Sequence, residues 1–429
     1  MTADIAEAYF HGQGLPRFWE RYRARAQDLT VVLWGDSLLA REQHTTVGDL
    51  DPTALPPTFH SRKLDWHLWQ CLDYPRPRYY RFDHPGCFRF RGRWDQAQDD
   101  PAWDDTGYRP GLTAFSSDPE AACFWTLPAD DAHAACGLLY RTDATGAEVE
   151  LRVASGPGRA LAWDERRADW VEAHGFRFSQ RHVQTGPRSG NTGYPRRLDL
   201  RRAPGYEGQV SFALQRTGAE CGRLLLWGAE CWDPRQGVLR VINSARGSHT
   251  LEMLVRSMDS EVWAHRPDLV VLELPLLNMV HQHPCVDYSV RWVWDVVWGD
   301  RPGAENDWAL RRGGPEAPDV LLVIPHHSRP HFAPDGGFAD LGGTDAREIY
   351  QAVRELIRRR GDVPMLDMAA IFLAEISADP RFPGPYQAMA GSSPDGLTYT
   401  TDDVHQNDRG TAIYARHLCQ ALLGEGCAS

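Results

Sequence analysis

The 429-residue sequence has no long hydrophobic run: no stretch of about 18 apolar residues, the length that a membrane-spanning helix needs, occurs anywhere in it. The first 28 residues also contain no continuous apolar core of about 7 to 15 residues, which a secretory signal would require. These absences predict a chain with no membrane span. They favour a cytoplasmic location, with export by a non-standard route left open.

Paired cysteines and excess positive charge are also lacking. The nine cysteines are scattered, their number is odd, and no Cys-x-x-Cys pair occurs, so neither a disulfide framework nor a zinc site is indicated. The formal net charge of −12 argues against nucleic acid as a partner, because no basic excess is present to neutralise phosphates. With 42% hydrophobic and 24% charged residues, the composition is that of an ordinary globular protein.

One short stretch near the N-terminus combines a buried strand with a polar turn. Residues 31–34, Val-Val-Leu-Trp, are four apolar residues in a row, which predicts a buried strand, and Gly35-Asp36-Ser37 follows as a turn. A hydroxyl at the carboxyl end of such a strand lies where open α/β sheets bind their ligands. Ser37 is therefore a candidate nucleophile, although Gly-Asp-Ser alone is also typical of an ordinary strand-ending turn.

The partners that a serine nucleophile needs occur near the other end of the chain. Asp402 and His405 are three residues apart, close enough for a carboxylate to orient an imidazole base. Residues 412–423 follow as an apolar segment that predicts a helix anchoring this loop. Taken alone, Asp-x-x-His also fits a solvated loop, and the two motifs together are the more specific signal.

These two motifs resemble those of the GDSL, or SGNH, hydrolase family. In that family, the serine of an N-terminal Gly-Asp-Ser-Leu block is the nucleophile, and a C-terminal Asp-x-x-His block supplies the other two residues of the triad. The resemblance implies Ser37 as the nucleophile, His405 as the base and Asp402 as the orienting acid, with Asp403 the neighbour that could be mistaken for it. It implies an esterase that uses no cofactor and no metal.

The same resemblance implies an oxyanion hole built from Ser37, Gly247 and Asn278. Two departures from the family pattern affect this assignment. The glycine position falls on Gly247 or Ser248, depending on where a residue is gapped. The small Gly-x-Asn-Asp block of the family is replaced here by the bulkier residues 275–279, Pro-Leu-Leu-Asn-Met. The alternative is that Asn278 is an ordinary turn residue and not an oxyanion donor.

The predicted fold class is α/β: a three-layer, flavodoxin-like SGNH sheet of about five parallel strands with an inserted, jelly-roll-like β-sandwich. Strands alternating with helices imply a parallel sheet. The predicted strands of this sheet are at 30–34, 238–242, 269–274, 320–324 and 363–367. Between about 57 and 229, short β-like runs separated by turns suggest a sandwich, with 141–146 predicted as a hairpin loop. The predicted domains are a discontinuous catalytic domain, 1–56 and 230–429, and an inserted domain, 57–229, with carbohydrate binding as a role considered for it.

Other residue types offer weaker hypotheses. His281 and His283 have a spacing that an extended segment could use for a metal, but no metal site is predicted there. His326, His327 and His331 follow a predicted strand and either line a substrate pocket or are satisfied loop histidines. The 16 tryptophans include several in the insertion, where exposed rings would stack on sugars.

The sequence therefore predicts a serine esterase that hydrolyses an ester through an acyl-enzyme. The expected substrate is a small-molecule or glycan ester, with an O-acetyl or other acyl ester of a carbohydrate as the first choice. One alternative is another reaction by the same triad, the transfer of an acyl group to a sugar hydroxyl. The other alternative is a binding or structural protein that has no catalytic activity. The oligomeric state is not predicted.

Overall fold

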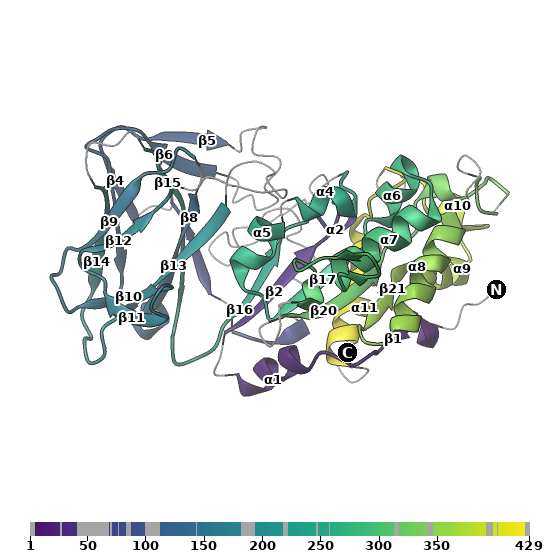
Figure 1. Cartoon of the computed structure of the whole chain (residues 1–429), viewed down its shortest axis with the longest axis horizontal. Helices are drawn as coiled ribbons and strands as arrows, with labels where there is room; N and C mark the ends of the chain where they lie inside the picture. Colours follow the sequence, from purple (N-terminus) through teal and green to yellow (C-terminus); the bar gives the residue numbers. More distant parts are fainter. Residues whose placement is uncertain are drawn as a thin grey trace.

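The computed structural model describes most of the chain. The described residues are 5–25, 28–40, 68, 71–75, 77–82, 87–98, 112–142, 144–181, 194–217, 222–245, 248–256, 258–312, 317–335, 337–340, 346–391, 398–400 and 402–424. They form a mixed α/β structure with several sheets (Figure 1). Within these residues, no helix is both long and apolar enough to cross a bilayer.

A six-stranded sheet organises the α/β part of the molecule. Its strands, in spatial order, are β1 (Tyr9–Phe10), β21 (Met365–Asp367), β20 (Asp319–Ile324), β17 (Leu269–Glu273), β2 (Leu29–Trp34) and β16 (Leu239–Asn243). All pairings are parallel except that of β1, a two-residue edge strand that pairs antiparallel with β21. β2 lies inside the sheet and every one of its residues is buried, as expected for an apolar run in a parallel sheet.

Helices cover both faces of this sheet. Successive residues of β2 alternate between two hydrophobic cores: Val32 and Trp34 belong to one, Val31 and Leu33 to the other. The first core includes residues of α4 (Leu251–Val255), α6 (Leu276–Gln282), α7 (Val286–Val297) and α8 (Ala346–Arg360). The second includes residues of α1 (Pro16–Ala24), α9 (Met368–Ala378) and α11 (Asp408–Leu423). Shorter elements are α2 (Ser37–Ala40), α5 (Met258–Glu261), α10 (Pro385–Ala388) and the pair β18 (Asp300–Arg301) and β19 (Ala304–Glu305).

Two antiparallel sheets make up the other part of the molecule, on the left in Figure 1. One contains β3 (Arg78–Arg81), β5 (Asp95–Gln98), β6 (Leu112–Ser116), β8 (Ala135–Thr142), β10 (Ala160–Asp164), β11 (Asp169–Glu172), β13 (Tyr194–Arg202) and β15 (Leu224–Trp232). The other contains β4 (Phe88–Arg91), β7 (Ala122–Leu127), β9 (Glu148–Val153), β12 (Phe176–Ser179) and β14 (Val210–Arg216). One hydrophobic core draws residues from both sheets, including Leu138 and Leu226 from the first and Trp125 and Phe212 from the second.

The prediction of a hairpin loop at 141–146 was wrong. β8, which ends at Thr142, pairs with β13 and β15, whereas β9, which begins at Glu148, pairs with β12 and β14. The connection therefore crosses from one sheet to the other. Turn residues mark where a strand ends but not which strand the chain joins next, so the sequence signal for a hairpin and for a crossing loop is the same.

Candidate functional site

The carboxyl ends of the parallel strands bring together the residues of the candidate site. β2 ends at Trp34, and Gly35 and Asp36 form the turn into α2, which begins at Ser37. A Cβ on Gly35 would lie 2.8 Å from the Cβ of Glu273, the last residue of β17, so only glycine allows this close approach. The structure describes the backbone of Ser37 but not its side chain.

Asp402 and His405 form a hydrogen-bonded pair in the loop before α11. The His405 Nδ1 lies 2.7 Å from Asp402 Oδ2, and the backbone N–H of His405 donates to Asp402 Oδ1 at 2.7 Å. Partial burial acts to raise the pKa of Asp402, but the backbone N–H and the ring of His405 outweigh it and lower the pKa below its ordinary value. The carboxylate therefore stays ionised and fixes the ring with Nδ1–H toward Asp402, which leaves Nε2 as the acceptor nitrogen.

Asp403 has a different role from its neighbour. Its carboxylate accepts two hydrogen bonds from Arg329 Nη1, both at 3.1 Å, and one from the backbone N–H of Gly391 at 2.6 Å. The backbone of Asp403 is left-handed, with φ of 71°, a conformation that aspartate tolerates better than most residues. Asp403 thus shapes the loop, while Asp402 contacts the ring of His405.

His326, which follows β20, supports the same loop. Its Nε2 donates to the carbonyl oxygen of Val404 at 3.0 Å, and its Nδ1 accepts from Gln406 Nε2 at 3.0 Å. These two bonds assign the tautomer of His326 and hold the residue directly before His405. His326 is fully buried and in this arrangement is a support for the loop.

A buried acid lies immediately before Ser37. Asp36 is fully buried; its Oδ1 accepts the backbone N–H of Leu38 at 2.9 Å, and its Oδ2 accepts Nδ2–H of Asn278 at 3.0 Å. Burial raises the pKa of Asp36 to about 6, against the lowering effects of Leu38, of a side-chain hydrogen bond with Glu273 and of the charge of His405. His405 is therefore near enough to Asp36 for its charge to lower the pKa of that carboxyl group.

Asn278, predicted as an oxyanion donor, lies in α6 just after β17. Its Nδ2 carries two hydrogens, and two acceptors engage it: Asp36 Oδ2 at 3.0 Å and the carbonyl oxygen of His249 at 3.1 Å. Gly247 lies outside the described residues. Ser248, the alternative to it, is exposed and left-handed with φ of 61°, and its carbonyl oxygen accepts Gln282 Nε2–H at 3.1 Å.

Sequence reasoning singled out the remaining histidines without assigning them. His327 and His331 are buried, with their Nδ1 atoms 3.2 Å apart, and burial lowers the pKa of His331 to about 3. His281 lies with its ring centroid 5.3 Å from that of His331, and His283 lies against Tyr288. Among the described residues, no group of three or more histidine, cysteine or acidic side chains is arranged to hold a metal ion.

Glu273 is a residue of the site that sequence reasoning missed. It is fully buried, and its Oε2 accepts a hydrogen bond from Tyr414 of α11. The available signal was a single acid at the end of an otherwise apolar strand, residues 269–273, Leu-Val-Val-Leu-Glu. Buried acids are rare unless they are paired or hydrogen-bonded, so such a residue marks a position that needs a physical explanation.

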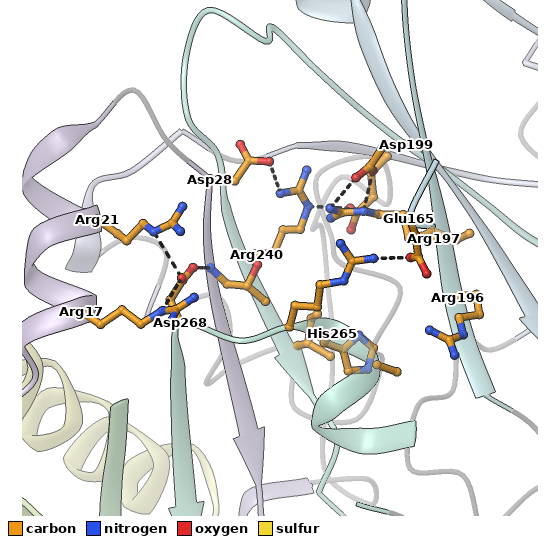
Figure 2. A pocket seen from close by; sticks show the side chains of 16 residues that line it. Arg17, Arg21, Asp28, Glu165, Arg196, Arg197, Asp199, Arg240, His265 and Asp268 are labelled. Carbon is orange, nitrogen blue, oxygen red and sulfur yellow. Dashed lines mark hydrogen bonds and ion pairs between the residues drawn. The ribbon is translucent and has the colours of Figure 1, made fainter. Parts of the chain in front are cut away.

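The opposite, amino-terminal edge of the same sheet carries a different cluster of charges (Figure 2). A cavity of about 330 Å³ lies there, between the sheet and β13 and β15. Arg240 bonds Asp28 at 2.7 Å and Glu230 at 3.0 Å, and Asp268 bonds Arg17 at 3.2 Å. Of these pairs, Arg240–Glu230 joins the α/β part to the antiparallel sheets, because Glu230 lies in β15.

No protein-family model and no curated protein matches the chain. Solved structures do resemble it. A peptidoglycan O-acetylesterase is 14% identical, with 95% of this chain and 94% of that one covered and a TM-score of 0.48. An acetyl xylan esterase is 19% identical, with 43% of this chain and 82% of that one covered and a TM-score of 0.32. A GDSL-like lipase from Parabacteroides merdae is 13% identical, with 43% and 73% covered and a TM-score of 0.31.

Proposed function

We propose that the chain is a serine ester hydrolase of the GDSL, or SGNH, type. The observation that supports this most directly is the Asp402–His405 pair, with Nδ1 and Oδ2 2.7 Å apart, whose charge acts on Asp36, the residue directly before Ser37. A serine at a strand end, a histidine base and a carboxylate that orients it are the parts that nucleophilic acyl transfer requires.

In this mechanism, Ser37 Oγ attacks the ester carbonyl carbon while Nε2 of His405 takes the hydroxyl proton. Asp402 stabilises the imidazolium that forms. The tetrahedral intermediate then expels the alcohol, which receives the proton from His405, and leaves an acyl-enzyme. Water, deprotonated by the same histidine, attacks the acyl carbon and releases the acid and Ser37.

The negative charge of the tetrahedral intermediate needs hydrogen-bond donors. We assign this role to the backbone N–H groups of Ser37 and Gly247 and to Asn278 Nδ2. Because Asp36 and His249 already engage both hydrogens of Nδ2, Asn278 would act by sharing one of them with the oxyanion. Each donor of this kind is worth about 10²- to 10³-fold in rate.

The proposal extends to the architecture and the substrate. The described six-stranded sheet would be the flavodoxin-like core of a discontinuous catalytic domain, 1–56 and 230–429. The two antiparallel sheets would be an inserted β-sandwich, 57–229. This part of the chain contains half-buried tryptophans, such as Trp94 and Trp163, the residue type whose ring faces stack on sugars. We therefore name an O-acylated carbohydrate as the substrate class.

One observation favours a silent binding module instead: both hydrogens of Asn278 Nδ2 are already used. Acyl transfer to a sugar hydroxyl would use the same triad and differ only in the group that accepts the acyl chain. Adding an acceptor sugar and detecting acylated sugar by mass spectrometry separates transfer from hydrolysis.

The test is hydrolysis of p-nitrophenyl acetate at neutral pH by the wild type, Ser37→Ala and the control His283→Ala, an exposed histidine that has no role in this mechanism. We expect activity in the wild type and the control and none above background in Ser37→Ala. Equal activity in all three would remove Ser37 as the nucleophile. No activity in any of them, together with no labelling of Ser37 by a fluorophosphonate, would favour the silent module.

A further inference from the structure

Two carboxyl groups lie in contact beneath the turn that carries Ser37. Asp36 and Glu273 are both fully buried, the backbone of Gly35 lies directly against Glu273, and a side-chain hydrogen bond with Glu273 lowers the pKa of Asp36. A carboxylate can only accept hydrogen bonds, so two ionised carboxylates cannot form one. The contact therefore requires one proton between the two groups.

The neighbouring donors indicate which group holds that proton. Both oxygens of Asp36 accept N–H groups, Oδ1 from Leu38 and Oδ2 from Asn278, and such contacts favour the ionised form. Glu273 accepts the hydroxyl of Tyr414 on Oε2. At neutral pH, this pattern is satisfied when Glu273 is protonated and donates to an ionised Asp36.

Other titratable groups face the pair from the surrounding elements. His405, from the loop before α11, acts on Asp36 by its charge, and Tyr350 of α8 is close enough to both acids for their charges to affect it. Burial raises the pKa of Tyr350 far above its usual range, so this phenol stays neutral. Within the described part of the chain, no arginine or lysine side chain bonds Asp36.

We propose that Asp36 and Glu273 are positioning residues that hold one proton between them and, in this form, orient Asn278 and the Ser37 turn for catalysis. The proposal rests on the proposed ester hydrolysis and adds to it two residues that touch neither substrate nor reacting atoms. Adding a proton to Asp36 removes the acceptor of Asn278, and removing the proton from Glu273 places two negative charges side by side. Either change disturbs the turn.

Two variants separate this role from a merely structural one. In Glu273→Gln, the amide donates to Asp36 and accepts from Tyr414 as the protonated acid does, so kcat should stay within about threefold of the wild type. In Asp36→Asn, the amide nitrogen can only donate, so it cannot accept the hydrogen bond from Leu38, Asn278 or Glu273 that it would face. We expect kcat for p-nitrophenyl acetate to fall about 10- to 100-fold while KM changes less than about threefold, as for a lost transition-state interaction.

The pH profile gives a second readout. Deprotonation of Glu273 should reduce kcat of the wild type on the alkaline side, and Glu273→Gln should lack this decline because its amide does not titrate. Circular dichroism and thermal melts of each variant check that the fold is kept. A wild-type kcat in Asp36→Asn, or an unchanged alkaline decline in Glu273→Gln, overturns the positioning role.

Infrared spectroscopy tests the shared proton without using activity. The wild type and Ser37→Ala should both show the C=O band of a protonated carboxylic acid at neutral pH, and Glu273→Gln should lack it. Absence of that band in the wild type overturns the proposal whatever the activity. If Ser37→Ala keeps full esterase activity, the proposed function fails and the catalytic role of the pair fails with it, while the band still decides whether the pair holds a proton.

Discussion

Acidic side chains have different partners at the two edges of the parallel sheet. At the amino edge, arginines neutralise the acids: Asp268 bonds Arg17, and Arg240, only 3% exposed, lies between Asp28 and Glu230. At the carboxyl edge, Asp36 is bonded by Leu38, Asn278 and Glu273 and not, within the described residues, by an arginine.

The pKa values follow this difference. Burial acts to raise the pKa of Asp28, but the charges of Arg240 and Arg197 outweigh it and the pKa is lowered. Burial of Asp36 outweighs the lowering effects of Leu38, Glu273 and His405, and its pKa rises to about 6. An acid paired with arginine stays charged and joins parts of the structure, whereas an acid paired with another acid retains a proton that it can exchange near neutral pH.

The largest expected effect is a loss of catalytic activity on substitution at the carboxyl edge of the sheet, with little change at the amino edge. Ser37→Ala should lower kcat/KM for p-nitrophenyl acetate at least about 1,000-fold, and Asp402→Asn about 100- to 10,000-fold, because nucleophile and orienting acid act as a unit. Asp28→Asn at the amino edge should leave kcat/KM within about threefold. A comparable loss in Asp28→Asn would show that the edges are not functionally distinct.

The next effect concerns stability. Arg240→Met should lower the free energy of unfolding by about 3–5 kcal/mol, because it removes the buried cation that bonds both Asp28 and Glu230 and leaves them only the more distant Arg197. Urea unfolding measures this. The matched control is Arg301→Met, which removes a partly exposed pair with Asp295 and should cost no more than about 1 kcal/mol. Equal losses in the two variants would contradict the role of burial.

The pH dependence of stability should have opposite signs at the two edges. The folded-state pKa of Asp36 is raised from 3.8 to about 6, so its contribution of about 3 kcal/mol is fully present below the unfolded value and is lost as the pH rises from about 4 to 6. The lowered pKa of Asp28 gives stability that is present above its unfolded pKa and is lost as the pH falls. Urea unfolding of Asp36→Asn between pH 4 and 7, and of Asp28→Asn between pH 2 and 5, should remove these slopes one at a time. The same slope in both variants would contradict the assignment.

The smallest expected effect is at the N-terminus of α11. Asn407 caps this helix by accepting the backbone N–H groups of Arg409 and Gly410, and Asn407→Ala should cost about 1 kcal/mol of stability. Because α11 carries Tyr414 against Glu273, we also expect a decrease of kcat of about twofold. Thermal unfolding and the p-nitrophenyl acetate assay measure the two effects. A loss of activity without a loss of stability would contradict the capping explanation.

The elements of the sheet were the most predictable part of the structure. Apolar runs placed strands at 30–34, 269–274 and 320–324, and the structure has β2, β17 and β20 there. The two-residue strand β1 was missed because Tyr9–Phe10 is too short for a period to be visible. The crossing connection at 141–146 was mistaken for a hairpin because turn residues do not specify a strand's partner.

The part of the candidate site that could be predicted is the pair Asp402 and His405, because both residues lie in one short segment. The Asp-x-x-His spacing of the family that the sequence resembles favoured Asp402 over Asp403. In the structure, Asp402 contacts the ring of His405 while Asp403 bonds Arg329. Whether Ser37 Oγ lies within reach of His405 stays a prediction. The contact between Asp36 and Glu273 joins two strands, and no feature of the sequence states whether a buried acid meets a cation or another acid.

The order of the strands also constrains how the protein acquires activity during synthesis. All pairings of the two antiparallel sheets lie between residues 78 and 232, so they can form before the rest of the chain is made. Ser37 is synthesised before them and His405 long after them. Ribosomes extend chains at about 5–20 residues per second, so the candidate nucleophile exists for many seconds without its base. Nascent chains that stop before residue 402 should therefore be inert toward esters, which a fluorophosphonate would reveal on stalled ribosomes.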